Sequence, residues 1–436
     1  MYYNMPEYGH NRENGGFMRE TGKSLTIPQL SAVMAGNALE FYDFLVFLFF
    51  AVPIAATFFP SESPTSSLLR ALAVSGVGFL ARPLGGLLIG PLGDRIGRKP
   101  AMLFSFGLMG FAIVGMALTP SYASIGIAAP ISVVIFRLLQ GFALGGEVGP
   151  TTAFLMEAAP PEKRGLYVSM QLATQYAATL TAGVIGVLLA QLLTPENLVS
   201  WGWRVAMLLG AAVVPLALII RRRLPETFER PAGVKPPAMT RAQLGLSLLM
   251  LAMAAAATIT TYTLITLNIF ATTTLGLTPT QAFGAVVIGG ICGAIGCPIG
   301  GRLCDRLGRK PVMITTFALL CAVSVPCFML MAQLRTTSVL YASAALMVSL
   351  LALGTPATLA FLSENLPAHL RSGGIGIIYA VAIALFGGTA PFVVTWLTDV
   401  TKSPIAPAWY MCAALLVALC AMLAVRESAP VKTGSR

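Results

Sequence analysis

The sequence predicts an all-α membrane protein in which twelve transmembrane helices form two pseudo-symmetric six-helix bundles. Three observations lead to this prediction: apolar stretches recur along the chain, basic residues gather in alternate loops, and one loop sequence occurs twice. The chain of 436 residues is 56% hydrophobic and only 10% charged, whereas a soluble globular domain carries about 25% charged residues. A lipid bilayer is therefore the expected surrounding of most of this chain.

Each of the twelve predicted spans is an apolar stretch of roughly 20 residues or more, long enough to cross a bilayer as a helix. In chain order they lie at 28–58, 66–92, 100–118, 122–157, 163–192, 200–221, 243–274, 280–304, 311–333, 337–364, 372–397 and 405–426. The polar tail at 1–26 lacks the short apolar core and the small-residue cleavage site of a signal peptide, so we expect the first stretch to be a true span.

Basic residues are distributed unevenly between the loops. The two tails and the even-numbered loops hold 22 of the 28 Lys and Arg residues, whereas the odd-numbered loops hold only Arg70, Arg204, Arg335 and Lys402. Cytoplasmic loops carry such an excess of Lys and Arg, so we expect a multi-pass protein of the inner or plasma membrane with both termini in the cytoplasm. The net charge of +11 then reflects orientation in the membrane, and no nucleic-acid partner is expected.

A repeated loop sequence divides the chain into two halves. GPLGDRIGRK at 90–99 follows the second span, and GRLCDRLGRK at 301–310 follows the eighth. A basic, Pro-containing stretch between the sixth and seventh spans is expected to be a linker. The predicted domains are a cytoplasmic tail at 1–26, a bundle at 27–221, a cytoplasmic linker at 222–242, a bundle at 243–426 and a cytoplasmic tail at 427–436. Paired bundles of this kind rock about a central site.

Residue types that hold metals or cofactors are sparse or unsuitably spaced. All seven Cys lie in spans of the second half without a zinc or redox spacing, and His10 and His369, the two His residues, fall outside the spans. The sequence contains no phosphate-binding loop of the G-x-x-x-x-G-K-[ST] type, no arrangement of catalytic residues and no sizeable output domain of a membrane sensor. We therefore expect no enzyme, no ATP-driven pump, no metal site, and no cofactor beyond protons as the coupling ion.

The repeated loop resembles the signature loop of the major facilitator superfamily. The pattern G-x-x-x-D-R-x-G-R-K lies between spans two and three in that family, and here it occurs in both halves. The resemblance implies the major facilitator fold and a cytoplasmic gate, in which Asp94 and Asp305 lie opposite the N-termini of spans eleven and five. A carboxylate is favoured at a helix N-terminus by roughly 0.3–2 kcal/mol. The expected gate residues are Gly90, Asp94, Arg95, Gly97, Arg98, Glu157, Arg164, Asp305, Arg306, Arg309, Glu364 and Arg371. The alternative is that these charges only anchor the loops.

Further stretches resemble the metabolite–proton symporters within that superfamily. They are GNALEFYDF at 36–44, FFP at 58–60, GFLARPLGG at 78–86, RLLQGFALGGEVG at 137–149 and WGWR at 201–204. PSYASIGIAAP at 120–130 and EKRGLYVSMQ at 162–171 are similar to the branch that transports citrate or tricarballylate with protons. Phe41-Tyr42 departs from the Gln-Phe of the citrate branch, which leaves the substrate open.

Five ionisable residues lie well inside the predicted spans, all in the first half: Glu40, Asp43, Arg82, Arg137 and Glu147. Such residues are costly in a bilayer and indicate a functional site. Arg137 resembles the arginine of span four that faces an acid of span one in proton-coupled members of the superfamily. A carboxylate beside Arg stays ionised, and the same group moved away from it in a low dielectric takes up a proton. We therefore expect Asp43 to carry the proton opposite Arg137, with Glu40 as the second candidate. Glu147 is counted with these proton-coupling residues, but we expect it to belong to a structural cluster rather than to carry the proton.

Arg82 lies twelve residues from Asp94, about 18 Å along a helix, which places it near the middle of the membrane. Its planar guanidinium fork matches a carboxylate, so we expect it to bind the substrate; the alternative is a structural pair with a neighbouring acid. The full set of expected substrate contacts is Asn37, Arg82, Arg137, Gln140, Gln171, Gln175, Tyr176, Thr261, Tyr262 and Tyr379. Interhelical hydrogen bonds are the alternative role for the Gln and Thr members.

Two arginines and no lysine inside the spans suit an anionic substrate. The sequence therefore predicts a secondary active transporter that takes up a small organic polycarboxylate, such as citrate, tricarballylate or a related di- or tricarboxylate, with protons by alternating access. Uptake of another small metabolite (2-oxoglutarate, shikimate or betaine) and proton-driven efflux are the alternatives. We expect the protein to act as a monomer embedded in the lipid bilayer.

Overall fold

The computed structural model describes residues 37–38, 41–96, 98–145, 155–156, 159–211, 241–365 and 378–433. Side chains are described for these residues apart from 90–99, 101–102, 241–243 and 433. Five residues expected at the proton site or the gate lie outside the described residues: Glu40, Gly97, Glu147, Glu157 and Arg371. The described part of the chain is mostly helical and contains no strand.

The first half of the chain begins with a helix that bends in its middle. Residues Phe41–Phe49 are helical, and α2 (Ala51–Phe58) follows at an angle of 68°. Pro53 explains the bend, because proline has no N–H to donate to the carbonyl four residues earlier, which is that of Phe49. The remaining elements of this half are α3 (Pro64–Leu80), α4 (Arg82–Ile96), α5 (Arg98–Leu118), α6 (Tyr122–Ile125), α7 (Ala128–Leu144), η1 (Pro161–Lys163), α9 (Arg164–Leu192), α10 (Pro195–Asn197) and η2 (Leu198–Gly202).

The second half is built in the same way from long helices. Its elements are α12 (Arg241–Ile265), α13 (Leu267–Thr273), α14 (Pro279–Leu307), α15 (Arg309–Leu334), α16 (Thr337–Glu364), η3 (Ile383–Gly387), α18 (Ala390–Thr401), α19 (Ala406–Ala424) and α20 (Pro430–Thr433). α14 begins with a capping box, in which the side chains of Thr278 and Gln281 each accept the other residue's backbone N–H. It ends at Gly308, whose φ of 106° favours glycine.

Eight of the described helices are long and apolar enough to cross a membrane, and Phe41–Phe49 with α2 makes a ninth. Leu103–Leu118 and Ala128–Leu144 are shorter apolar helices that coincide with the third and fourth predicted spans. The sixth predicted span is described only as far as residue 211. All twelve predicted spans therefore have a helical counterpart, in whole or in part, among the described residues, and the predicted fold class is confirmed.

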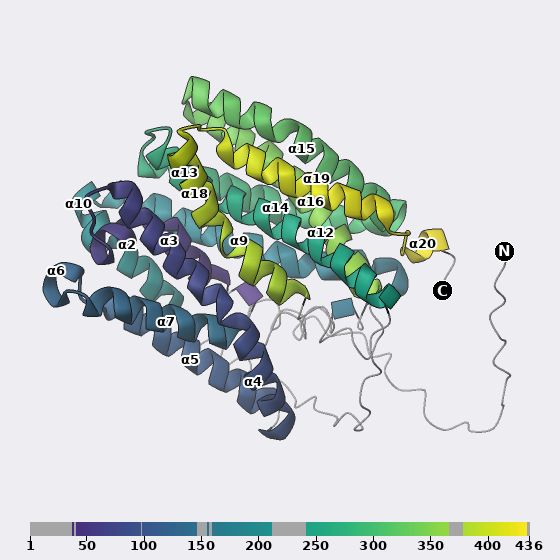
Figure 1. Ribbon diagram of the computed structural model, residues 1–436, viewed down its shortest axis with the longest axis horizontal. Helices are drawn as coiled ribbons and strands as arrows, with labels where there is room; N and C mark the ends of the chain where they lie inside the picture. The colour runs from purple at the N-terminus through teal and green to yellow at the C-terminus, as the bar shows by residue number, and fades with distance from the viewer. Residues whose placement is uncertain are drawn as a thin grey trace.

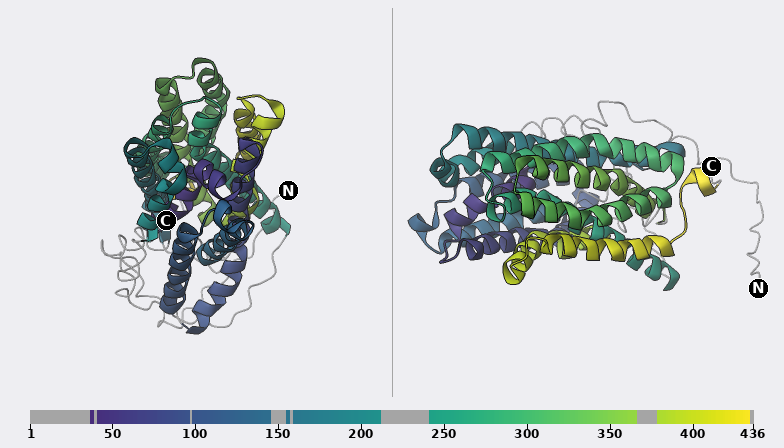
Figure 2. Two further views of the ribbon diagram at one scale, coloured as in Figure 1. Left: turned by 90° about the vertical axis from the view of Figure 1, so that its left-hand side faces the viewer. Right: turned by 90° about the horizontal axis from the view of Figure 1, so that it is seen from above.

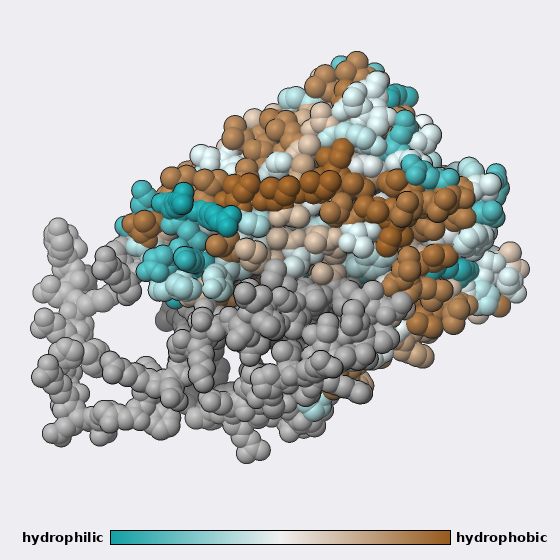
Figure 3. Space-filling model, turned by 180° about the vertical axis from the view of Figure 1, so that it is seen from behind, coloured by the Kyte–Doolittle hydropathy of each residue, from teal (hydrophilic) through white to brown (hydrophobic). Residues whose placement is uncertain are grey.

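The outward surface of the helices is apolar. Leu87, Ile127 and Leu192 are 68%, 67% and 78% exposed. On the face shown in Figure 3, apolar side chains run along the molecule and hydrophilic side chains gather toward its ends. Contiguous exposed apolar surface of this extent is typical of contact with a membrane.

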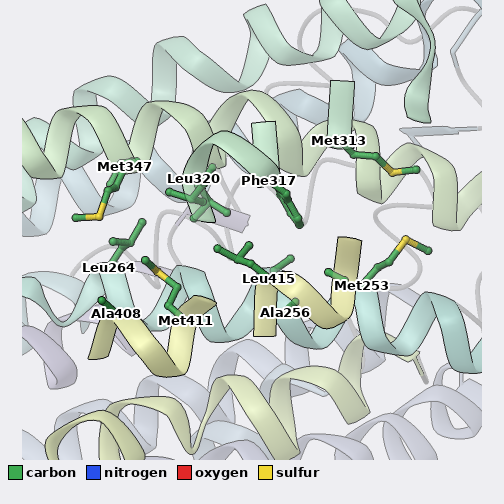
Figure 4. Packing of buried hydrophobic residues seen from close by; sticks show 14 of the residues in the cluster. Met253, Ala256, Leu264, Met313, Phe317, Leu320, Met347, Ala408, Met411 and Leu415 are labelled. Carbon is green, nitrogen blue, oxygen red and sulfur yellow. The ribbon is translucent and has the colours of Figure 1, made fainter. Parts of the chain in front are cut away.

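Each half has its own apolar core. In the second half, Phe317 of α15 and Leu415 of α19 belong to a large cluster of buried side chains, part of which is drawn in Figure 4. In the first half, Phe50 and Trp203 belong to a second cluster. The two clusters agree with two bundles, whereas the predicted linker boundaries remain predictions because the described residues stop at 211 and resume at 241.

The two halves meet along two pairs of helices. α9 packs along α14 (Figure 1), and a Cβ added at Gly293 would lie 2.0 Å from the Tyr176 ring, so glycine permits this close approach. On the other side, α3 packs against η3 and α18. Figure 2 shows that the long helices of both halves run in the same general direction.

The two ends of the molecule differ in the loops that they carry. We call the end with the second repeated loop, Asp305–Arg309, and α20 the loop end (Figure 1). The opposite end, which carries α6, α10 and α13, is the far end. The region between the halves and between these ends is where a transport site is expected.

Candidate functional site

A cavity of about 70 Å³ lies between the two halves. Its polar lining consists of amide and hydroxyl groups: Gln175, Tyr176, Thr179, Thr258, Thr261, Tyr262, Thr355, Thr358 and Tyr379. Five of these belong to the expected substrate contacts, namely Gln175, Tyr176, Thr261, Tyr262 and Tyr379, and none of the residues that line the cavity is charged. Sites for small molecules occupy roughly 300–1,000 Å³, so the halves must separate before a metabolite fits.

Two buried arginines lie against aromatic rings of the first half. Arg82 and Arg137 are 6% and 1% exposed. The guanidinium carbon of Arg82 is 5.0 Å from the centre of the Phe44 ring and 4.4 Å from that of Phe79. That of Arg137 is 4.8 Å from Phe44 and 4.0 Å from Phe47. Such cation–π contacts offset part of the cost of burying a cation.

Tyr262 of α12 links these rings to the cavity. Its ring packs edge-on against Phe44 and Phe79, with centroid distances of 6.3 and 5.2 Å. Tyr262 lines the cavity, whereas neither Arg82 nor Arg137 does. The aromatic layer of Phe44, Phe79 and Tyr262 therefore joins the two halves beside the cavity, with both arginines packed on its first-half rings.

The hydrogen bonds of Arg137 run to neutral groups. Its Nη1 donates to Oε1 of Gln140 at 2.9 Å, and its Nη2 donates to Oγ of Ser75 at 3.0 Å. Asp43 is 2% exposed, and neither of its carboxylate oxygens has a hydrogen-bond partner among the residues that the structure describes. Asp43 and Arg137 are near enough to interact electrostatically, but no hydrogen bond joins them among the described residues. The expected exchange of a proton between this pair remains a prediction.

Three other expected substrate contacts have partners within the first half. The Asn37 side-chain nitrogen donates to the Gln171 carbonyl at 3.0 Å and to the Thr174 hydroxyl at 2.8 Å. Gln171 is 2% exposed, and Gln140 holds Arg137 as described above. Asn37, Gln140 and Gln171 do not line the 70 Å³ cavity, so the structure brings together only part of the expected substrate-binding set.

Toward the far end, a hydrogen bond joins the two halves at the bend caused by Pro53. The Asn268 side-chain nitrogen of α13 donates at 2.9 Å to the carbonyl of Phe49, which is the carbonyl that Pro53 leaves without a helical donor. The ring centroids of Phe50 in the first half and Phe283 in the second half are 4.9 Å apart. Beyond these contacts, a cavity of about 850 Å³ lies between α2 and α3 on one side and α13 and α18 on the other.

At the loop end, Asp305 joins α14 to the first half. Its two carboxylate oxygens accept the backbone N–H groups of Gly165 and Leu166 at 2.9 Å each, so the acid caps the N-terminus of α9. The guanidinium group of Arg309 donates to Asp305 at 2.6 Å and to Glu364 at 2.9 Å. The side chains of Asp94, Arg95 and Arg98 in the first copy of the loop lie outside the described side chains.

The remaining gate candidates differ in their surroundings. Arg164 begins α9 and is partly buried. Arg306 lies in the last turn of α14 and is exposed. Gly90 lies within α4. The role of the whole set as a gate remains a prediction.

Sequence reasoning missed an acid at the loop end. The carboxylate oxygens of Glu427 accept the backbone N–H groups of Arg309 and Lys310 at 2.9 Å, and therefore cap α15. The next residue, Ser428, donates its hydroxyl to Glu364 at 2.7 Å. An acid directly after the last span was the available signal, but the expected tail at 427–436 received no role. Ser75, Phe44 and Phe79 were also missed, since neutral and aromatic residues are common inside spans.

Comparison with known proteins agrees with this architecture. The family model of the Major Facilitator Superfamily matches residues 33–379 and 249–436. A citrate-proton symporter of Salmonella typhi is 36% identical over 423 residues, which cover 94% of this chain and 96% of that protein. A citrate-proton symporter of Klebsiella pneumoniae is 33% identical over 418 residues, covering 93% of each chain. The alpha-ketoglutarate permease of Escherichia coli (strain K12) is 32% identical over 392 residues, covering 88% and 90%.

Solved structures show the same fold at lower identity. A D-xylose-proton symporter superposes with a TM-score of 0.74 at 18% identity, covering 93% of this chain and 99% of that one. A partially occluded inward open conformation of the xylose transporter from E. coli also has a TM-score of 0.74, at 17% identity and with coverages of 92% and 98%. At these identities the likeness concerns the fold alone.

Proposed function

Because the chain belongs to the Major Facilitator Superfamily, we propose that it is a secondary active transporter that takes up a small organic polycarboxylate, such as citrate or tricarballylate, together with protons. The observation that carries this proposal is the buried guanidinium group of Arg137: among the described residues its hydrogen-bond partners are neutral, and the nearby carboxyl group of Asp43 has no partner. A buried cation of this kind is stabilised when a carboxylate pairs with it. Among the described residues Asp43 is the candidate carboxylate, and an anionic substrate would be another.

Substrate binding would use both arginines. A guanidinium group offers two parallel N–H donors to a carboxylate, and a polycarboxylate carries enough such groups to reach Arg82 as well as Arg137. Both arginines pack on Phe44, so one ring borders both guanidinium groups. The hydroxyl and amide groups of the cavity would then hold the uncharged part of the substrate.

Proton coupling would use Asp43. An ionised carboxylate without a partner is costly in a low dielectric, and taking up a proton removes that cost. When Arg137 pairs with Asp43 instead, the ionised form is favoured and the proton leaves. Each proton that enters with the substrate also offsets one of its negative charges.

Alternating access would open the two ends in turn. The excess of basic residues in the even-numbered loops and tails supports a cytoplasmic position for the loop end. The contacts of Asp305 with α9 then close the cytoplasmic side, and the Asn268 contact with Phe49 closes the opposite side. The cavity of about 850 Å³ at the far end would be the outer vestibule through which substrate arrives.

A second candidate function is the uptake of a metabolite with one carboxylate and several hydroxyl or keto groups. The observation that favours it is the lining of the central cavity, which is rich in Thr and Tyr hydroxyls and contains no charged residue. Some relatives are named for other substrates, among them a shikimate transporter of Escherichia coli (strain K12) that is 32% identical over 408 residues.

Transport by the purified protein in liposomes tests the proposal. An imposed gradient, acidic outside, should drive accumulation of radiolabelled citrate or tricarballylate, and unlabelled di- and tricarboxylates should compete better than shikimate or betaine. Asp43→Asn should abolish this accumulation while substrate exchange without a gradient remains. Best competition by shikimate would favour the second candidate, and uptake that ignores the gradient would refute proton coupling.

A further inference from the structure

Three side chains compete for the donors of Arg137. The neutral acceptors are Ser75 of α3, which is fully buried, and Gln140, one turn along α7. The third is the carboxyl group of Asp43, which is near enough to interact electrostatically with the same arginine and has no hydrogen bond among the described residues. In this structure the neutral acceptors hold both terminal nitrogens of the guanidinium group.

The surroundings leave Arg137 few other partners. Its guanidinium group packs on Phe44 and Phe47, which lie on the same helix as Asp43. The other titratable groups around the pair are Arg82 of α4 and Tyr262 of α12, together with Tyr42, which adjoins Asp43 in the chain. Tyr42 donates its hydroxyl to the Ala206 carbonyl at 2.9 Å. Glu40 and Glu147 lie outside the described residues. Within the described part of this site, the candidate acceptors for the Arg137 guanidinium group are therefore Ser75, Gln140 and Asp43.

The charge on Asp43 determines which acceptors bind the guanidinium group of Arg137. An ionised carboxylate attracts the charged guanidinium group by a full Coulombic interaction in addition to the hydrogen bond, whereas a neutral hydroxyl or amide oxygen does not. An ionised Asp43 would therefore draw the guanidinium group away from Ser75, whereas a protonated Asp43 would compete poorly. The observed arrangement, with Arg137 on its neutral acceptors, fits the protonated form.

We infer that Ser75 positions Arg137 for proton coupling, by supplying the neutral acceptor that receives the guanidinium group when Asp43 takes up its proton. Gln140 supplies the second neutral acceptor. The proton step is balanced, since the Asp43 carboxylate and one proton from water form a carboxylic acid while Arg137 keeps its charge throughout. This inference rests on the proton-coupled transport proposed above.

Removal of the Ser75 hydroxyl should shift proton coupling. In Ser75→Ala, Nη2 of Arg137 loses its acceptor, and Asp43 becomes its best remaining partner. The ionised form of Asp43 is then favoured. The loss of the hydrogen bond from Arg137 to the neutral Ser75 hydroxyl predicts about tenfold weaker proton binding by Asp43. The pH of half-maximal transport should therefore fall by about one unit. At saturating proton concentration the affinity for substrate should not fall, because Arg137, which we propose to bind the substrate, keeps its charge and loses only a neutral acceptor.

The test measures substrate counterflow against pH, together with the protons taken up on substrate addition, in liposomes that contain the full-length protein. Ser324→Ala is the matched control, because Ser324 is also fully buried but its hydroxyl bonds to a carbonyl of its own helix, α15. Gln140→Leu is the second variant and should shift the midpoint in the same direction as Ser75→Ala. Size-exclusion profiles and thermal unfolding establish that each variant is folded.

The outcomes separate this inference from the proposed function. A wild-type protein that accumulates substrate with protons, together with a Ser75→Ala midpoint equal to that of wild type, overturns the role of Ser75 alone. If Ser75→Ala does not fold, an unshifted Gln140→Leu midpoint overturns the inference. If wild-type transport does not depend on protons, both the inference and the proposed function fail.

Discussion

The contact between Asp305 and α9 predicts a measurable effect of the substitution Asp305→Asn. Both carboxylate oxygens of this residue accept backbone N–H groups of the other half, at 2.9 Å. Its side chain is only 8% exposed, and it also pairs with Arg309. The substitution keeps the size of the side chain but removes its charge and one acceptor oxygen, so the loop end should open more often.

The magnitude follows from the two hydrogen bonds between the halves. A hydrogen bond to a charged group contributes about 1.5–3 kcal/mol, and one between neutral groups about 0.5–1.5 kcal/mol. The substitution makes one of the two bonds neutral, at a cost of about 0.5–1 kcal/mol, and removes the other, at a cost of about 1.5 kcal/mol at the lower end of the range, so the pair loses at least about 2 kcal/mol. Since 1.4 kcal/mol corresponds to a factor of ten, the population open at the loop end should rise about 30-fold.

A native cysteine reports this opening. Cys304 is fully buried, and its sulfur packs so closely on α9 that a Cβ added at Gly165 would lie 2.4 Å from it. The rate at which N-ethylmaleimide labels Cys304, followed by mass spectrometry of peptides, should therefore rise about 30-fold in Asp305→Asn. Cys327, buried within the core of the second half, should keep its slow rate.

Two results would refute the reasoning. An unchanged rate at Cys304 would mean that the Asp305 contacts do not hold the loop end closed. An equal increase at Cys304 and Cys327 would mean that the substitution loosens the whole second half. Asp399→Asn is the matched control, because it removes an exposed ion pair with Lys402 at the far end, where exposed pairs contribute about 0–1 kcal/mol.

Three further substitutions have defined outcomes. Arg82→Ala should abolish the rise in unfolding temperature caused by citrate, which stabilises the native state only by binding to it; an unchanged rise would place Arg82 outside the site. Gly293→Val should block transport, because a Cβ there lies 2.0 Å from the Tyr176 ring, and wild-type uptake would contradict the close packing of α9 on α14. Glu427→Gln should lower the free energy of unfolding by about 1 kcal/mol through the weakened cap of α15, measured by thermal unfolding against the exposed Glu196→Gln as control.

The spans and the repeat could be predicted because both are local properties of the chain. Hydropathy over about 20 residues identifies a span whatever its neighbours are, and the repeated loop reads directly from the sequence. The bend after Phe49 was missed, although Pro53 was a visible signal for it. The pairing of the freed Phe49 carbonyl with Asn268 could not be predicted, since these residues are 219 positions apart.

The candidate site was predicted in part for the same reason. Tyr and Thr residues on α12 line the cavity, since one face of a helix that borders a cavity carries its polar side chains. Asn37 was expected to contact the substrate, but its side-chain amide donates hydrogen bonds to Gln171 and Thr174 of α9. Sequence spacing identifies the polar face of a helix, but the neighbouring helix decides whether that face meets a cavity or another side chain.

The sequence by itself determined that the protein is embedded in lipid, how many spans it has and that charged residues lie inside the spans of the first half. Composition and hydropathy predict these properties because they do not depend on contacts between distant residues. Only the tertiary structure decided what that charge touches. Arg137 bonds to Ser75, 62 positions away, rather than to Asp43, and it packs on Phe44 outside the cavity lining. These choices arise when helices pack against one another, because a buried donor takes the acceptor that lies within its reach.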